Sequence, residues 1–409
     1  MYILIILSFI SLSFSQFSTN FLNGFGNNRD VISTFSESMG EMWMNNSNRN
    51  NWDPLLASSL YSSDLTKICV SSSITGNQSD FYKTYNQNFE FINFSFPIYK
   101  NMGLGIGFSP NTVANYVFEE DPVRISGTEF SHPLLSTSSH IIKGGISELS
   151  LSLSRGFIFK NSTLALGFKW NILFGNQQIN SVSNLQKVTY DQNGNEILTL
   201  IEDLYNDEYN SFNAYQYEFD SRIIINDKNS ISLLMTLTDD FEINNNKVHQ
   251  LFSSSEKYFM DQVQLDRLGF GYMYNIDDNF GIASELHFKN SIDIPFELML
   301  FDSPLPTKIS FHNGLYKRFY NMQSESWNSI NLSVGCKYKI IKFKNRDLRD
   351  ISCSFGSGIL FNDLKNNIDI SLTIGLVENI MESIGYDSYY KINIAFFSGD
   401  KWFKKRRRN

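Results

Sequence analysis

The chain has 409 residues, of which 19% are charged and 15% are aromatic, so it has fewer charges than the roughly 25% of an ordinary soluble protein and too many rings for a disordered one. Only one apolar run exceeds about a dozen residues, which excludes a bundle of transmembrane helices. The formal charge is -8, and the basic residues concentrate in the last nine positions instead of lining a face, so the sequence does not indicate a nucleic-acid binder. Three cysteines without a Cys/His cluster indicate neither a structural zinc site nor any other cofactor.

The N-terminus begins with an apolar run from Tyr2 to Phe14, which has the length of the hydrophobic region of an export signal. Small residues at Ser13 and Ser15 allow cleavage before Gln16, so residues 1–15 are predicted to be a signal peptide. The alternative is a buried N-terminal strand or helix.

Residues 16–66 show no regular alternation of apolar and polar side chains, and they precede the first predicted strand. They contain Met39, Met42, Trp43 and Met44, which suit an internal wall better than water. We therefore expect this segment to form a plug inside the barrel predicted below. A periplasmic extension is the alternative.

Residues 67–400 alternate between apolar and polar or small side chains in segments of about ten residues, the length of a tilted strand that crosses a membrane. Leu149, Leu151 and Leu153, for example, alternate with serines. About fourteen such segments are predicted, starting near Lys67, Phe89, Met102, Ile146, Thr163, Asn213, Ser230, Gln264, Asn279, Lys308, Ser329, Asp350, Asn367 and Tyr389. A soluble sandwich or barrel would show the same alternation.

The lengths of the connections between these segments distinguish a membrane barrel from a soluble sandwich or barrel. Short connections (100–101, 160–162, 226–229, 275–278) alternate with long ones (118–145, 176–212, 239–263, 290–307). Bacterial outer-membrane barrels have this order, with tight periplasmic turns and long external loops, and an even strand number returns both ends to the periplasm. The sequence therefore predicts an all-β transmembrane antiparallel barrel in the bacterial outer membrane, with residues 401–409 as a basic periplasmic tail.

Three features resemble the FadL/TodX family of outer-membrane transporters of hydrophobic compounds. Residues 38–40 (Ser-Met-Gly) and 52–57 (Trp-Asp-Pro-Leu-Leu-Ala) are similar to the family's MGG and WNPAGLA motifs, with Asp53 and Leu55 as departures. Residues 103–108 resemble its glycine-rich third strand, and the length, strand count and segment before the barrel also match. Some outer-membrane subunits of secretion machines, such as PorV, share this architecture, so membership does not fix function.

The resemblance implies passive uptake of a hydrophobic molecule, such as a long-chain fatty acid, with lateral release through a gap at a kink in the third strand. The residues placed at that gap are Gly107, Ser109, Pro110 and Asn111. Proline cannot donate a ladder hydrogen bond, so it belongs at an edge, an end or a bulge. If Pro110 lies at a gap, pairing between the second and third strands should end at Phe108. The alternative is that Pro110 marks the outer rim of the strand.

The lumen-facing positions are moderately basic and could bind a carboxylate or sulfate headgroup through charge-assisted hydrogen bonds. The predicted ligand-binding residues are Lys169, Arg222, Arg267, Lys308, Lys337, Trp43 and Met44. The alternative is an internal network of ion pairs that packs the lumen. His287 and His312 lie near Ser310 and Glu285, but no spacing specifies a Ser-His-acid hydrolase, and no enzyme activity is predicted.

Two functions remain open. The first is a monomeric channel for a hydrophobic small molecule, surrounded by outer-membrane lipids. The second is a barrel that does not transport but docks partners in a secretion or surface-attachment complex. An apolar pocket between plug and wall, with a gap in the wall, would favour transport, and a sealed lumen with hydrophobic external loops would favour docking. The predicted loop 176–212 is acidic, which gives docking little support at this stage.

Overall fold

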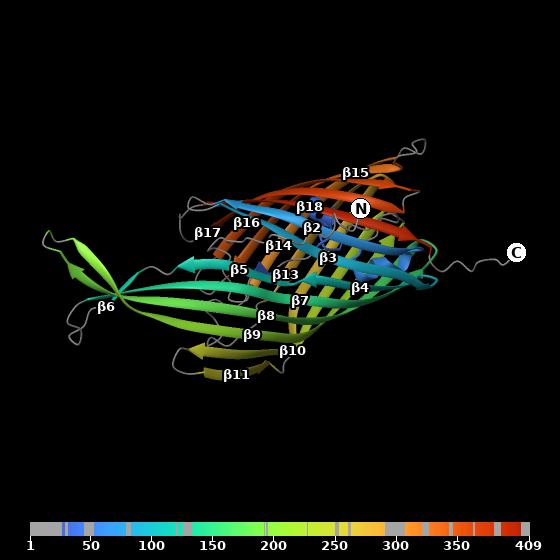
Figure 1. The fold of residues 1–409 in the computed structure, drawn as a ribbon. Helices are drawn as coiled ribbons and strands as arrows, with labels where there is room; N and C mark the ends of the chain where they lie inside the picture. Colours follow the sequence, from blue (N-terminus) through green and yellow to red (C-terminus); the bar gives the residue numbers. More distant parts are fainter. Residues whose placement is uncertain are drawn as a thin grey trace.

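The chain forms one closed antiparallel β-barrel of fourteen wall strands (Figure 1). The computed structural model describes residues 27–28, 32–44, 53–78, 83–119, 122–125, 133–191, 193, 195–226, 228–249, 253–260, 263–290, 307–320, 327–342, 347–362, 365–379 and 386–401. The predicted signal peptide and residues 402–409 of the basic tail lie outside these residues. No helix in this described part is long and apolar enough to cross a membrane.

Each wall strand pairs with its neighbour in the chain, and the last strand pairs with the first to close the barrel. The wall strands are β2 (Thr66–Gln78), β3 (Lys83–Tyr99), β4 (Met102–Pro110), β7 (Leu134–Ile158), β8 (Ser162–Tyr190), β9 (Glu196–Ile225), β10 (Asn229–His249), β12 (Gln264–Asp277), β13 (Phe280–Lys289), β14 (Thr307–Tyr320), β15 (Ser329–Lys342), β16 (Asp347–Phe361), β17 (Asn366–Asn379) and β18 (Tyr386–Asp400). Four shorter strands add to this sheet: β1 (Asn27–Asn28), β5 (Thr112–Glu119), β6 (Val123–Ile125) and β11 (Ser253–Met260). Closure pairs the last wall strand with the first, as a barrel in a bilayer requires.

The alternation of side chains divides each wall strand between the lipid and the lumen. Leu151 is 41% exposed, whereas Ser152 is 3% exposed. Leu372 is likewise exposed and Ser371 is buried. The predicted phase of these strands is therefore confirmed, with leucine towards lipid and serine towards the interior.

Tight turns join the strands at the end of the barrel where the C-terminus lies (Figure 1). Asn101, Asn226 and Asn362 have φ angles of 58°, 51° and 53° in these turns. Asparagine tolerates this left-handed conformation at low cost, which lets the chain reverse within a few residues. By the usual arrangement of outer-membrane barrels, this end faces the periplasm.

The opposite end differs from the sequence prediction. Residues 118–145, 176–212 and 239–263 were expected to be loops, but most of them are strand: β7 starts at Leu134, β8 runs to Tyr190, and β9 starts at Glu196. The prediction was wrong because it required an apolar face towards lipid, and these residues pair as strands beyond the lipid-facing belt. The predicted loop 290–307 lies almost entirely outside the described residues.

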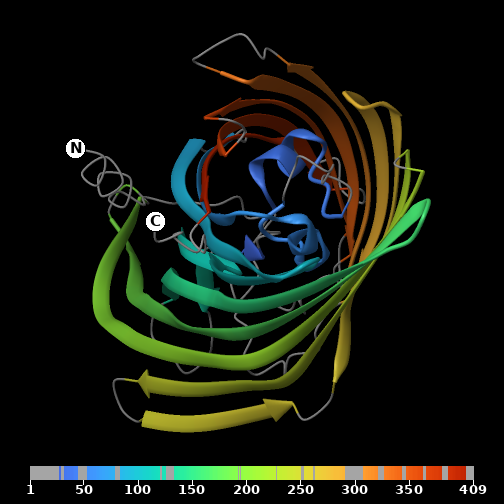
Figure 2. The same cartoon turned by 90° about the vertical axis from the view of Figure 1, so that its right-hand side faces the viewer.

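Residues 32–44 and 53–62, here called the lumen segment, lie within the ring of strands (Figure 2). Helix α2 (Thr34–Ser38) contacts β15 to β18, and the 3-10 helix η2 (Ala57–Ser62) contacts β3, β4, β7, β8 and β9. Glycines in the wall permit this approach, since a Cβ at Gly335 would lie 2.0 Å from the backbone of Met39 and one at Gly103 would lie 2.4 Å from that of Leu60. These residues are the main described part of the segment 16–66, whose role as a plug stays a proposal.

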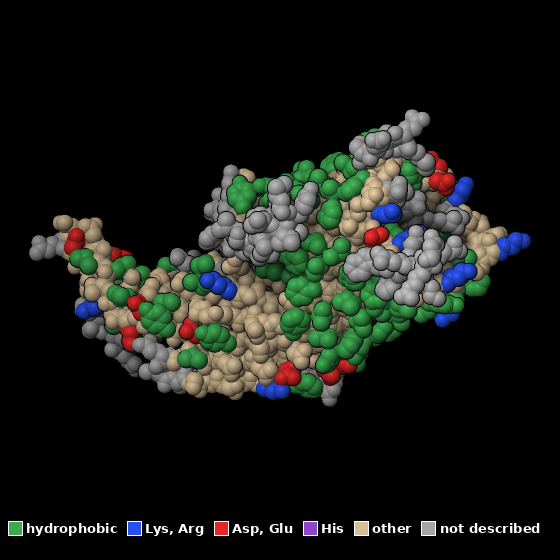
Figure 3. Space-filling view, turned by 45° about the vertical axis from the view of Figure 1, so that its right-hand side comes forward, with side chains coloured by type: hydrophobic (Ala, Val, Ile, Leu, Met, Phe, Trp, Pro, Cys, Tyr) green, Lys and Arg blue, Asp and Glu red, His purple; other side chains and the backbone are tan. Residues whose placement is uncertain are grey.

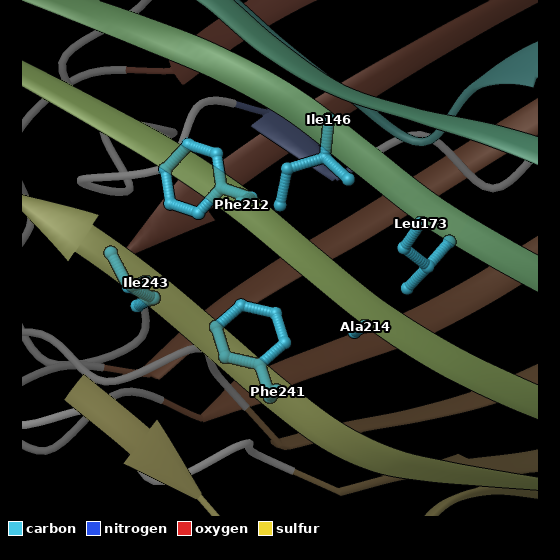
Figure 4. Packing of buried hydrophobic residues seen from close by; sticks show 6 residues of the cluster. All are labelled: Ile146, Leu173, Phe212, Ala214, Phe241 and Ile243. Carbon is cyan, nitrogen blue, oxygen red and sulfur yellow. The ribbon is translucent and has the colours of Figure 1, made fainter. Parts of the chain in front are cut away.

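The external end of β7 to β10 has its own apolar core (Figure 4). Six buried side chains form this cluster, and Tyr258 of β11 packs against it. The buried members are Ile146, Leu173, Phe212, Ala214, Phe241 and Ile243. They join four strands at the level where these strands leave the barrel, which stabilises the base of the extension seen at one end of Figure 1.

Candidate functional site

The wall changes its pairing at the predicted gap residues. β3 pairs with β4 from Tyr99 and Met102 to Ile92 and Phe108, and the register ends there. Ser109 and Pro110 pair only with β7 among the described residues, and the chain continues beside β7 as β5. Pro110 is therefore the last residue of β4, and β5 begins two residues later at Thr112. Gly107 precedes this point, and a Cβ there would lie 2.5 Å from Ser150 Oγ.

The N-terminal strand β1 lies at the edge of β5. Its two residues pair with Thr112 and Val113. The hydroxyl of Thr112 also accepts a hydrogen bond from the Ile146 amide at 3.0 Å, and the Asn111 amide donates to the Ile146 carbonyl at 2.8 Å. The segment before the barrel thus occupies part of the edge that β3 leaves.

A cavity of about 60 Å³ lies between the lumen segment and the wall, beside this point. Trp43, Lys169 and Arg267 line it, and so do Ser109 and Asn111. The structure therefore brings three predicted ligand-binding residues together with two predicted gap residues. An engineered apolar cavity of about 150 Å³ holds benzene in a protein core. This space is smaller, and its lining carries several charges.

The cations of this cavity already have partners. Lys169 Nζ lies 3.2 Å from Glu218 Oε1 and donates to the Leu55 carbonyl at 3.4 Å. The Arg267 guanidinium lies over the Trp43 ring, 3.7 Å from its centroid. These contacts hold the lumen segment against the wall, as the alternative prediction of an internal ion-pair network describes.

The other predicted ligand-binding residues lie apart from this cavity. Lys337 Nζ contacts Glu41 Oε1 at 2.7 Å and Asp350 Oδ2 at 2.9 Å. Arg222 donates to Ser230 at 2.7 Å, and Lys308 is buried on β14. Met44 is fully buried in the lumen segment. The structure therefore does not gather the predicted set into one binding site.

Wall carboxylates also bind the lumen segment through its backbone. Glu285 accepts hydrogen bonds from the amides of Trp43 at 2.7 Å and Met44 at 2.8 Å. Asp220 accepts the Ser58 amide at 2.8 Å. Sequence reasoning named Glu285 only as an acid near His287 and His312 and missed Asp220, because neither backbone contact leaves a signal in the sequence.

The lumen segment holds itself together around Asp53. This carboxylate accepts hydrogen bonds from Ser33 Oγ at 2.9 Å, Ser36 Oγ at 3.1 Å and the Leu55 amide at 2.8 Å. Asp53 stands where the resembling family has asparagine, and the carboxylate supplies the acceptors that these three donors need.

The Ser310–His312 pair also binds the lumen segment. His312 Nε2 lies 2.8 Å from Ser310 Oγ, and His312 Nδ1 lies 2.6 Å from the Gly40 carbonyl oxygen. The nearby carboxylate of Glu285 contacts His287 instead, at 2.8 Å. A hydrolase triad would place a carboxylate on His312 Nδ1, so this arrangement fixes the segment's position and differs from a catalytic one.

The strands β8 and β9 continue beyond the barrel and pair with each other in an extension, here called the external ribbon (176–190 and 196–211). On its two flanks β7 pairs with β8 as far as Lys187, and β10 pairs with β9 as far as Asn206. Outward side chains of β8 change from Trp170 and Phe174 to Asn176, Gln178 and Asn180 as this ribbon begins. Its length of about 14 steps corresponds to about 45 Å at roughly 3.3 Å per residue. Figure 3 shows hydrophobic side chains gathered over the barrel and interspersed with acidic ones along the extension.

The tip of the external ribbon exposes large apolar side chains to water. Their exposed fractions range from 44% to 54%, and the residues are Ile197, Leu198, Leu200, Ile201, Leu204 and Tyr205. Contiguous exposed apolar surface outside the lipid marks an interaction site. The run Ile-Leu-Thr-Leu-Ile at residues 197–201 was the signal in the sequence, and the acidic residues around it obscured that signal.

The closed barrel, its short periplasmic turns and its internal segment define an outer-membrane barrel of the TodX type, as the sequence resemblance implied. A monoaromatic hydrocarbon channel, CymD, is similar in structure, with 11% identity over 91% of this chain and 98% of that chain and a TM-score of 0.55. The toluene transporter TodX of Pseudomonas putida has 11% identity over 93% of this chain and all of its own, with a TM-score of 0.50. At this identity the likeness shows the fold alone.

The sequence matches the BamG family over residues 1–409, so the chain belongs to the BamG family. No curated protein matches it in sequence.

Proposed function

We propose that this chain is an outer-membrane barrel that docks a partner protein at the cell surface through its external ribbon. One observation carries the proposal: the apolar tip of the ribbon, residues 197–205, is exposed to water well beyond the lipid-facing wall. Burying such a surface against a partner is favourable by about 25 cal/mol per Å² of apolar area.

The lumen supports the same proposal. The cavity beside the lumen segment has a volume of about 60 Å³ and a charged lining. Its Lys169 contacts Glu218, and its Arg267 lies over the ring of Trp43. Glu285, Asp220 and Lys337 bind the segment from three other strands. A lumen segment attached to the wall at several points suits a scaffold, because a channel would need these contacts to break at each passage.

Passive uptake of a hydrophobic molecule, such as a fatty acid, is the second candidate. The loss of pairing between β3 and the third wall strand after Phe108 favours it, since this break lies beside the cavity. The similar solved structures are described as a hydrocarbon channel and a toluene transporter. Uptake by this route requires displacement of the lumen segment and lateral release at Ser109, Pro110 and Asn111.

Two variants separate the candidates. The first replaces residues 183–204 by Asn-Gly, a two-residue turn that joins Val182 to Tyr205, which lie directly opposite each other. The second replaces Ser109-Pro110-Asn111 by Val-Thr-Val, which restores a ladder donor and strand-forming residues.

Docking predicts that the shortened ribbon reduces the chain to its monomer mass on native gels of gently solubilised outer membranes, while the wall variant keeps the larger assembly. Uptake predicts the opposite pattern in an assay of radiolabelled fatty acid or toluene entry: the wall variant loses uptake and the shortened ribbon keeps it. A wild-type chain that migrates as a monomer and supports uptake would refute docking.

A further inference from the structure

The outer edge of β9 at the ribbon tip has no partner strand among the described residues. β8 pairs with β9 along the whole ribbon, up to Tyr190 and Glu196. β10 covers the other edge of β9 only as far as His249 opposite Asn206. Residues 196–205, here called the free edge, therefore present one row of backbone amides and carbonyls to the outside.

We propose that the free edge binds an extended strand of a partner protein by β-strand addition, and that this strand carries apolar side chains interspersed with lysine or arginine. This inference rests on the proposed docking function and specifies its mode. In an antiparallel strand every second residue directs its amide and carbonyl to a given side, so about half of these ten residues can bond to the added strand.

The sequence of the free edge contains neither lysine nor proline, two of the residues that protect edge strands from strand addition. Soluble edge strands carry lysine or proline, or are covered. Residues 196–205 contain no lysine and no proline, and six of the ten are exposed apolar residues. One irregularity in the register, opposite Leu185 and Gln186, interrupts the ribbon, but both sides of it keep their pairing with β8. Such an edge in water requires a partner.

Charge selects the kind of strand. Residues 176–211 contain six carboxylates and one basic residue, Lys187. Glu196 is paired with Arg124 at 2.5 Å, whereas Glu202 and Asp203 lie beside the apolar side chains of the free edge. A second copy of this chain would bring these acids together, so like-charge repulsion disfavours self-pairing. A strand with basic residues gains attraction at the same positions.

The test uses the full-length protein in lipid nanodiscs and a fluorescent ten-residue peptide of alternating valine and lysine. Two control peptides replace either the lysines by glutamate or two valines by proline, which removes backbone donors. Fluorescence anisotropy measures affinity, and hydrogen–deuterium exchange measures protection of the ribbon amides.

Two tyrosines provide matched variants. Tyr205 lies on the free edge and is 54% exposed, and Tyr209 of β9 is 43% exposed but has β8 on one side and β10 on the other. Both are replaced by lysine, so the charge changes are identical. Both positions lie outside the barrel wall, and the heat-dependent gel mobility of the barrel checks that each variant folds.

The proposal predicts that the valine–lysine peptide binds and slows hydrogen exchange at the free edge, and that the proline peptide binds at least about tenfold more weakly. Tyr205→Lys should weaken binding of the valine–lysine peptide about tenfold, whereas Tyr209→Lys should change it by less than about twofold. Failure of the valine–lysine peptide to bind, equal binding of the proline peptide, or amides 196–205 that already exchange slowly in the free protein would overturn it. If the native assembly still depends on the ribbon in that case, docking stands and only strand addition fails.

Discussion

Replacing Glu285 by alanine should release the lumen segment from one side of the barrel. The carboxylate accepts the Trp43 amide at 2.7 Å and the Met44 amide at 2.8 Å, and it is 1% exposed. Its removal leaves the buried Met44 amide and the part-buried Trp43 amide without this acceptor, and a buried donor left unpaired costs about 1–3 kcal/mol. The attachment of the lumen segment to the wall should therefore weaken by about 2–6 kcal/mol. The fraction of molecules in which residues 43 and 44 are detached from the wall then rises roughly 30-fold to 10⁴-fold.

Hydrogen–deuterium exchange of the Trp43 and Met44 amides measures this population, because both amides exchange only when the bonds to Glu285 open. Glu285→Gln keeps one acceptor oxygen and should give an intermediate rate. Asp369→Asn is the control, since Asp369 is a buried wall carboxylate that accepts from Asn367 of its own strand. Unchanged exchange in Glu285→Ala would refute the inference that this carboxylate holds the segment.

Three further outcomes are expected. Leu151→Arg on the lipid face should lower the free energy of unfolding by about 2–4 kcal/mol in urea titrations of the protein in lipid vesicles. Leu198→Arg on the ribbon should change it little, and equal costs would mean that both residues face lipid or that both face water. Phe241→Ala should cost about 3–5 kcal/mol at the base of the ribbon and raise protease cleavage of β9 and β10 without altering barrel mobility on gels. Cys336 and Cys353, whose sulfur atoms lie 3.3 Å apart on paired strands, should form a disulfide on mild oxidation, detected by mass spectrometry of non-reduced peptides; two free thiols after oxidation would contradict the pairing register.

The wall of the barrel could be predicted from the sequence because lipid imposes a strong pattern on it. Leu151 and Leu372 face outward and their serine neighbours face inward, as the alternation indicated. The β3–β4 pairing ends at Phe108, as expected if Pro110 lies at a gap, and the gap itself stays a prediction.

The external ribbon could not be predicted in the same way. Residues 176–212 leave the membrane, so no face of this segment has to be uniformly apolar, and its acidic and amide residues suggested a loop. What makes it a strand is long-range pairing, such as Asn180 with Asp207 at 2.7 Å. The same limit applies to the lumen segment, where a backbone amide of Ser58 meets Asp220 across 162 positions of sequence.

The central claim is that the tip of the external ribbon contacts a partner protein outside the cell. A photo-crosslinking amino acid at Leu200, introduced into the full-length chain in intact cells of the native bacterium, tests it most directly, with the same probe at the lipid-facing Ile370 as control. The account predicts one discrete protein adduct from Leu200 and none from Ile370. The absence of any protein adduct from the probe at Leu200, although the probe is shown to be photoreactive, would contradict it.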